Sequence, residues 1–340
     1  MVKRSLVLLT LVVAACGPAA STAPTPSATA SPQPSAIATS SPAPSPSASP
    51  SRSPIPLPNS AQAAAAGNGV VWILIGDRLF RSTDRGETWS ERGLPSPTSV
   101  PFVTNIAFAS ATQGWILSAG SPATQCQSQA FEILRTTDGG GTWQSVSAAS
   151  DTAQCKENLA FVDAQHGYMT SYDPNSAPQV WRTTDGGVHW AASRLPDPPG
   201  FTTRPGGLAL RLGPVADFGS VLFVGAIGPG GGRDESHYAF RSTDGGATWT
   251  FAGKAPWAET GPVFLTASHW FQLIVPGPST ETTDGGATWH PFATDYQQAA
   301  PIAPQLVFGD ANTGYATVRG AIQRTIDGGA HWTALKTPGT

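Results

Sequence analysis

A nine-residue motif occurs six times in this 340-residue chain and constrains its fold more than any other feature. Each copy begins with Arg or Glu, has Ser or Thr before a central Asp, and has Gly between this Asp and a final Trp. The aspartates are Asp84, Asp138, Asp185, Asp244, Asp284 and Asp327, and the tryptophans are Trp89, Trp143, Trp190, Trp249, Trp289 and Trp332. Successive aspartates are 40 to 59 residues apart, a period typical of propeller blades or solenoid units.

The residue types of the motif indicate a structural turn. Asp followed by Gly-Gly is a hairpin signal, because glycine adopts positive φ without a Cβ clash. We expect the carboxylate to accept hydrogen bonds from amides two or three residues on, and neighbouring Ser and Thr hydroxyls to add bonds. The tryptophan begins the next strand, where its ring is expected to pack against a neighbouring sheet. We therefore interpret the six aspartates as structural, and not as catalytic acids or metal ligands.

Short apolar strands joined by Gly-containing turns fill the sequence between the motifs. One example is Asn105–Phe108 followed by Gly114–Leu117. Four such strands per repeat and no long helical period predict an all-β fold, in which four-stranded sheets repeated around an axis form a propeller. The weakest expected strand is Ala61–Ala66. We predict six blades; seven would require a blade without the motif. The predicted blades span residues 59–93, 102–148, 157–194, 206–253, 260–293 and 303–337.

The motif resembles the Asp box, or bacterial neuraminidase repeat, found in sialidases, sortilin-type propellers and photosystem II stability/assembly factors. The unit of an apolar strand, Gly-Trp or Gly-Tyr, and then Arg-Thr-Thr-Asp-Gly-Gly is most similar to the assembly-factor type. This resemblance implies the propeller fold. It implies little about activity, because the repeats are scaffold, and nothing else in the sequence points to photosynthesis.

Residues 1–15 have the order of an export signal. Lys3 and Arg4 precede an apolar run, Leu6 to Val13, that is too short to span a bilayer. Small residues before Cys16 resemble the lipobox of bacterial lipoproteins, which implies that Cys16 carries the lipid. We expect a protein exported from the cytoplasm and anchored to the membrane of a bacterial cell envelope. The alternative is an ordinary signal peptide with a chance cysteine.

Residues 16–58 are rich in Pro, Ser, Ala and Thr. Such a segment has too little apolar surface to offset its ordering entropy, so we predict a disordered tether between the anchor and a folded domain at 59–340. The chain has a formal net charge of −3 and lacks basic runs. These properties argue against a nucleic-acid partner, and no motif indicates a cofactor.

Two cysteines remain after Cys16, namely Cys126 and Cys155. Because the exported compartment is oxidising, we predict a disulfide between them. The expected topology places them in loops on the same face of neighbouring blades, which permits the bridge. Two free thiols are the alternative.

The two faces of the predicted propeller differ. If the strands of each blade are named A to D, the A–B and C–D loops share one face, which we call the box face. The B–C and D–A loops share the other, which we call the loop face. Loops on a rigid scaffold often carry function, and the longest ones lie on the loop face. Candidate binding residues in them are Arg204, Arg233, Asp234, Glu235, His237 and Trp257.

A sialidase or another glycoside hydrolase is the enzymatic alternative. Resemblance to sialidases would require three arginines converging on a carboxylate and a Tyr–Glu pair. The Arg-Ile-Pro signature before the first box is missing, and five box arginines have a structural explanation. Nucleophile-elbow, metalloprotease and phosphate-loop motifs are also missing from the sequence. We predict no catalytic residue and no metal, and hypothesise a monomeric surface module that binds a protein or a glycan.

Overall fold

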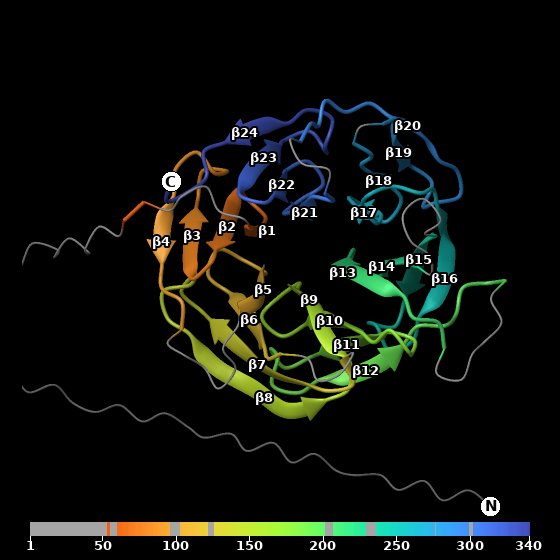
Figure 1. The fold of residues 1–340 in the computed structure, drawn as a ribbon, viewed down its shortest axis with the longest axis horizontal. Coiled ribbons are helices and arrows are strands. Elements are labelled where there is room, and N and C mark those ends of the chain that lie inside the picture. The colour runs from red at the N-terminus through yellow and green to blue at the C-terminus, as the bar shows by residue number, and fades with distance from the viewer. Residues whose placement is uncertain are drawn as a thin grey trace, which may run out of the picture. The chain divides into compact units, whose positions relative to one another are not determined.

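The computed structural model describes residues 53–54, 60–95, 103–121, 126–200, 207–228, 236–275, 277–298 and 302–340. The described residues all belong to one compact unit, Ser53–Thr340. This unit contains six sheets of four antiparallel strands, arranged in a ring (Figure 1). The predicted six-bladed, all-β propeller is confirmed. The described residues include no helix that is long and apolar enough to cross a membrane.

Each blade is formed by four strands that are consecutive in the sequence. Blade 1 contains β1 (Gln62–Ala66), β2 (Val70–Ile75), β3 (Arg78–Ser82) and β4 (Ser90–Arg92). Blade 2 contains β5 (Val103–Phe108), β6 (Gly114–Ala119), β7 (Gln129–Thr136) and β8 (Gln144–Thr152). Blade 3 contains β9 (Cys155–Phe161), β10 (Gly167–Tyr172), β11 (Gln179–Thr183) and β12 (Ala191–Arg194).

The second half of the ring repeats this order. Blade 4 contains β13 (Arg211–Asp217), β14 (Leu222–Ile227), β15 (His237–Ser242) and β16 (Thr250–Ala255). Blade 5 contains β17 (Val263–Phe264), β18 (Trp270–Gln272), β19 (Ser279–Thr282) and β20 (His290–Phe292). Blade 6 contains β21 (Gln305–Phe308), β22 (Gly314–Val318), β23 (Ala321–Thr325) and β24 (Thr333–Leu335). The first strand of every blade lies nearest the axis (Figure 1).

The ring closes without exchanging a strand between its first and last blades. The alanine-rich β1, the weakest expected strand, pairs with β2 along its whole length. Blade 6 then bonds directly to blade 1: the Ala63 amide donates to Gln305 Oε1 (3.1 Å), and the Thr317 hydroxyl donates to the Ala61 carbonyl (3.1 Å).

Every Asp box closes its C–D turn through the same short-range hydrogen bonds. In blade 2, the Thr136 hydroxyl donates to Asp138 Oδ1 (2.8 Å) and accepts from the Gly140 amide (3.0 Å). Asp138 also accepts from the amide and the hydroxyl of Thr142, both at 2.9 Å. The carboxylate bond common to all six boxes comes from the amide four residues on. The expected bond from the amide three residues on is present as well at Asp138 and Asp185.

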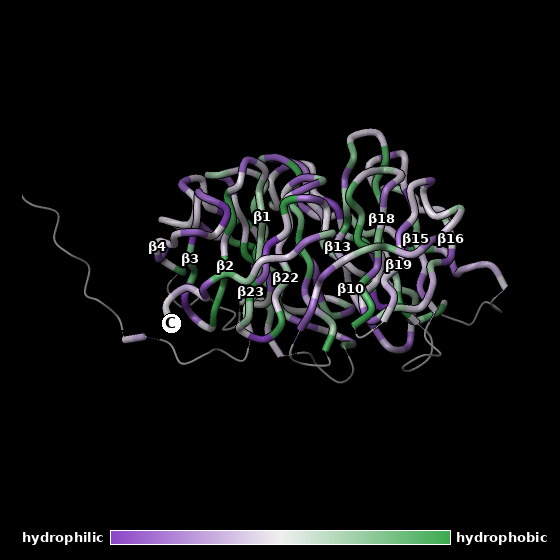
Figure 2. The backbone as a smooth tube through the Cα atoms, turned by 90° about the horizontal axis from the view of Figure 1, so that it is seen from above, coloured by the Kyte–Doolittle hydropathy of each residue, from purple (hydrophilic) through white to green (hydrophobic). Residues whose placement is uncertain are grey.

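Six hydrophobic clusters occupy the six seams between neighbouring blades. Each cluster joins residues of two adjacent blades and contains the box tryptophan of the second blade. Trp143, for example, contacts the Phe108 ring edge-on, and its indole N–H donates to the Gly93 carbonyl of blade 1 (2.9 Å). The seam between blades 6 and 1 includes Tyr315 and Ile73, so packing of the same kind closes the ring. Apolar stretches follow strands such as β2 and β18 in side view (Figure 2).

In three blades the second strand begins with a glycine, because a larger residue at this position would collide with a phenylalanine ring. Gly114 pairs with Phe108, and a Cβ on Gly114 would lie 2.2 Å from the phenylalanine ring. This space lets Phe108 stack on Trp72 of blade 1, with ring centroids 3.7 Å apart. The same close approach occurs between Gly167 and Phe161 and between Gly314 and Phe308.

A disulfide joins blades 2 and 3 on the loop face. Cys126 and Cys155 are bonded, with Cα atoms 5.0 Å apart, as predicted. Cys155 is the first residue of β9 and does not lie in the preceding loop as we expected. In the chain-entropy model, a closed loop of 29 residues stabilises the fold by about 3–4 kcal/mol.

Lys156, next to the disulfide, is a buried cation that holds the turn before β9. It is 3% exposed, and its Nζ donates to the carbonyls of Ala153 (2.6 Å) and Gln154 (2.8 Å). The ammonium also lies 4.7 Å from the centre of the Trp181 ring. Burial away from water lowers the pKa of Lys156 to about 8.

We expect Gly114→Ala to destabilise the propeller by about 1–3 kcal/mol, because the added methyl group displaces Phe108 from its stack on Trp72. Chemical denaturation measures the change. The control is Gly213→Ala: a Cβ at Gly213 has its nearest neighbour at 3.9 Å, so little loss is expected. Equal losses in the two variants would contradict this steric explanation.

The folded protein is expected to gain stability between pH 8 and 10.5. Across this range the unfolded state keeps a proton on Lys156 that the folded state has released, so the free energy of unfolding rises with pH. The gain is at most about 3 kcal/mol. Denaturation of Lys156→Met should lack this rise, whereas the exposed Lys254→Met should retain it. An unchanged pH dependence in Lys156→Met would refute the assignment.

Candidate functional site

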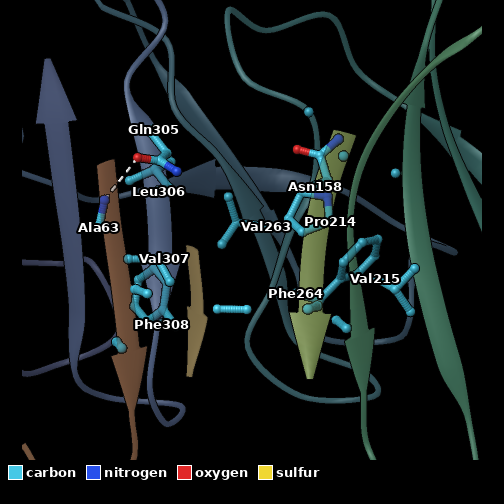
Figure 3. Close-up of a pocket in the computed structure, with 18 of the residues that line it drawn as sticks. Ala63, Asn158, Pro214, Val215, Val263, Phe264, Gln305, Leu306, Val307 and Phe308 are labelled. Atoms are coloured by element: carbon cyan, nitrogen blue, oxygen red, sulfur yellow. Dashed lines mark hydrogen bonds between the residues drawn. The ribbon is translucent and has the colours of Figure 1, made fainter. Parts of the chain in front are cut away.

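A cavity of about 780 Å³ lies along the axis, lined mainly by the inner strands β1, β5, β9, β13, β17 and β21. Small and aliphatic side chains form much of its wall, including Ala63, Pro214, Val263 and Leu306 (Figure 3). The inner strands start at the loop face, so their first residues form the mouth of the channel on that face. All six blades contribute residues to this cavity.

Polar side chains concentrate at this mouth. Arg211, at the start of β13, forms an ion pair with Glu157 of β9 (3.1 Å), and its guanidinium lies 5.4 Å from the centre of the Tyr172 ring. The hydrogen bond to Glu157 is the main reason that the pKa of Arg211 is raised. The Arg211 side chain is 66% exposed, so part of the guanidinium remains available to a ligand.

Three side-chain amides occupy corresponding positions in three inner strands, each three residues before a phenylalanine. They are Asn105, Asn158 and Gln305, and all three line the cavity. Asn105 Oδ1 is buried and has no hydrogen-bond partner. β5, β9 and also β13 each have a bulge near this level, where the register with the second strand shifts. Bulges of this kind re-aim side chains and are frequent near functional sites.

Four carboxylates line the channel among the residues that the structure describes, and each has a partner. Glu157 pairs with Arg211, and Glu259 accepts from the Val275 amide (3.3 Å). Two aspartates cap the A–B loops: Asp217 accepts from Gly219 N (2.6 Å), and Asp310 accepts from Thr313 N (2.7 Å) and Asn312 N (2.9 Å). Among the described residues, no group of three or more His, Cys, Asp or Glu is arranged to hold a metal ion.

The box residues lie away from this channel, in turns that bond to A–B loops; the Gly139 amide, for example, donates to the Thr112 carbonyl. The amide of Thr142 and the Thr136 and Thr142 hydroxyls lower the pKa of Asp138 to about 2. His189 and His331 stand at the Thr142 position of their boxes, with Nδ1 2.6 Å from the aspartate in each case. Carboxylates held ionised in this way are unsuited to general acid catalysis.

The box arginines also lie outside the channel. Arg81 donates to the Ala111 carbonyl of the next blade (3.2 Å), and Arg324 of blade 6 pairs with Glu87 of blade 1 (2.6 Å). Arg211 is the one arginine among the described residues that line the cavity. The three convergent arginines of a sialidase are therefore not found in the described part of the channel.

The candidate loop residues have different environments. His237 is the first residue of β15 and 1% exposed, so a ligand on the loop face does not reach it. Burial lowers the pKa of His237 to about 4, and its Nδ1 lies 3.3 Å from Gln272 Nε2. Trp257 is half-buried after β16. Cys16, Arg204, Arg233, Asp234 and Glu235 lie outside the described residues.

Sequence reasoning missed the residues at the mouth, namely Asn105, Glu157, Asn158, Arg211 and Gln305. One signal was present: an amide residue recurs three positions before phenylalanine in Asn105–Phe108, Asn158–Phe161 and Gln305–Phe308. A polar residue at the same place in three apolar inner strands indicates a shared polar level around the axis.

Comparison with protein-family models supports the repeat. Residues 80–91 match the BNR/Asp-box repeat model. Xyloglucanase Xgh74A of Acetivibrio thermocellus is 31% identical over 205 residues, which cover 51% of this chain and 22% of the relative. A xyloglucanase of a Paenibacillus species is 24% identical over 186 residues, which cover 48% and 16%. The chain thus matches about a fifth of the length of these curated relatives.

Two solved structures are similar to this chain over most of its length. YCF48 from Cyanidioschyzon merolae has a TM-score of 0.49 and 18% identity, covering 83% of this chain and 87% of that one. The GH74 xyloglucanase from Xanthomonas campestris has a TM-score of 0.49 and 15% identity, covering 83% and 46%. With six boxes, six four-stranded sheets and a closed ring, this protein is a six-bladed β-propeller built from Asp-box repeats.

Proposed function

We propose that this protein is a lipid-anchored surface module that binds a protein or a glycan through the loop face of its propeller, without catalysing a reaction. Its disulfide is typical of an exported protein. Lipidation at Cys16 and the predicted tether over 16–58 would hold the propeller at the cell envelope.

The main support for this proposal is that the carboxylates lining the channel already have ion-pair or hydrogen-bond partners. A glycoside hydrolase uses two carboxyl groups that flank the scissile bond, and one of them must hold a proton. Here Glu157 is paired with Arg211, and Glu259, Asp217 and Asp310 accept backbone amides. Each carboxylate therefore has a structural role, whereas the exposed Arg211 and the side-chain amides remain suited to binding.

Glycoside hydrolysis is the second candidate, favoured by the 31% identity to a xyloglucanase. Only part of that enzyme is matched, so its activity does not transfer with the repeats. An assay for hydrolysis of a glycoside substrate distinguishes the binding function from the hydrolase function.

Incubation of the purified protein with xyloglucan, sialosides and a panel of aryl glycosides is expected to release no sugar. Reducing-end and fluorescence assays measure the release. Turnover that is abolished by Glu157→Gln but retained by Glu87→Gln, a substitution on the box face, would establish a hydrolase and overturn the binding proposal.

Crosslinking on intact cells is expected to recover a specific partner, identified by mass spectrometry. Arg211→Glu should reduce its recovery by breaking the ion pair with Glu157 and so disrupting the mouth, whereas Gln165→Glu on the box face should leave it unchanged. Equal recovery with both variants would show that the partner binds elsewhere on the propeller.

A further inference from the structure

The orientation of the Gln305 side chain is fixed by the backbone of blade 1. Its Oε1 accepts from the Ala63 amide (3.1 Å). A backbone N–H can only donate, so the oxygen must face Ala63 and the nitrogen must face the other way. Figure 3 shows this nitrogen directed into the cavity. Gln305 therefore presents a hydrogen-bond donor.

Asn158 is oriented in the opposite sense. Its Nδ2 donates to the Leu212 carbonyl (2.8 Å) and to the Thr170 hydroxyl (3.0 Å), which uses both amide hydrogens. A carbonyl can only accept, so the assignment of nitrogen and oxygen is again fixed. The Oδ1 atom is directed toward the cavity (Figure 3). Asn158 therefore presents a hydrogen-bond acceptor.

The backbone at Asn158 supports a functional role for this arrangement. Asn158 has φ of 50°, a left-handed conformation within β9, at the point where the register with β10 shifts. Such a conformation is costly for a residue other than glycine and is frequently retained at binding sites. The bulge places the amide at the level of Gln305, on the opposite side of the cavity (Figure 3).

The wall between the two amides selects the type of ligand. Pro214, Val263 and Leu306 are small or aliphatic (Figure 3). The rings of Phe108 and Phe161 are 5% and 7% exposed and stack on tryptophans of the neighbouring blades. Those two rings offer no free face for a sugar to stack on, whereas Phe218, Phe264 and Phe308 also line the cavity and are half-buried. A donor and an acceptor on opposite walls match a secondary amide, and the apolar surface between them matches small aliphatic side chains.

We propose that Asn158 and Gln305 bind the backbone of an extended, uncharged peptide segment with small side chains at the mouth of the channel. One backbone N–H donates to Asn158 Oδ1, and a backbone carbonyl on the other side of the segment accepts from Gln305 Nε2. Successive residues of an extended chain point these groups to opposite sides. This inference rests on the proposed binding function and identifies the class of ligand for its site.

The test uses the full-length protein and a pool of capped, uncharged hexapeptides of Ala, Val, Ser and Pro. Fluorescence polarisation is expected to detect binding of pool members at micromolar to millimolar concentration. Gln305→Glu keeps the oxygen that accepts from the Ala63 amide of blade 1 and replaces the donor with an acceptor, so affinity should fall at least about tenfold. Gln165→Glu on the box face is the matched control, with affinity unchanged.

A second measurement changes the ligand and leaves the protein intact. Replacing backbone N–H groups by ester oxygens, one position at a time, should weaken binding by about three- to tenfold at the position that contacts Asn158. Binding of no pool member, or equal affinity of Gln305→Glu and the unmodified protein, would overturn the proposal. So would selective binding of N-acetylglucosamine oligomers in place of peptides. If the peptide proposal failed in this way but cell-surface crosslinking still recovered a partner, the general binding function would stand.

Discussion

The hydrogen-bonded closure of the Asp-box turn is the constraint on which the rest of the structure depends. A hydroxyl, a carboxylate and two amides within seven residues fix each turn, as between Thr136 and Thr142. The fixed turn directs the following tryptophan into the seam with the preceding blade. Six such seams close the ring, and the closed ring creates the axial cavity. The box carboxylates are thus far from the proposed chemistry of binding, although they are the most conspicuous residues in the sequence.

The fold was predictable because its determinants are local and repeated. Each box encodes its own turn, and the spacing between boxes leaves room for four strands, even where the sequence is as uninformative as β1. The disulfide was predictable because topology brought Cys126 and Cys155 to one face. Other features depend on tertiary context. The turn at Asp138 adds an amide four residues on to the expected one three residues on. His237, expected in a loop, begins a strand and is buried between blades by packing that involves Gln272.

The candidate site was less predictable because no single blade contains it. Asn158 and Gln305 are 147 residues apart in sequence, and only ring closure places them across one cavity. Their recurrence before phenylalanine was visible in the sequence, but the direction of each amide was not. That direction comes from the bulge at Asn158 and from backbone groups of adjacent blades, Leu212 and Ala63. The same contacts that tie blades together therefore determine which atoms face the channel.

Hydrogen exchange at the six box turns tests the central claim, that equivalent turns and seams close one continuous ring. The reporters are the glycine amides bonded to the box hydroxyls, from Gly86 in blade 1 to Gly329 in blade 6. If the ring is closed, these two terminal turns exchange as slowly as the turns of blades 2 to 5. Rapid exchange confined to blades 1 and 6 would show an open ring and would contradict the account.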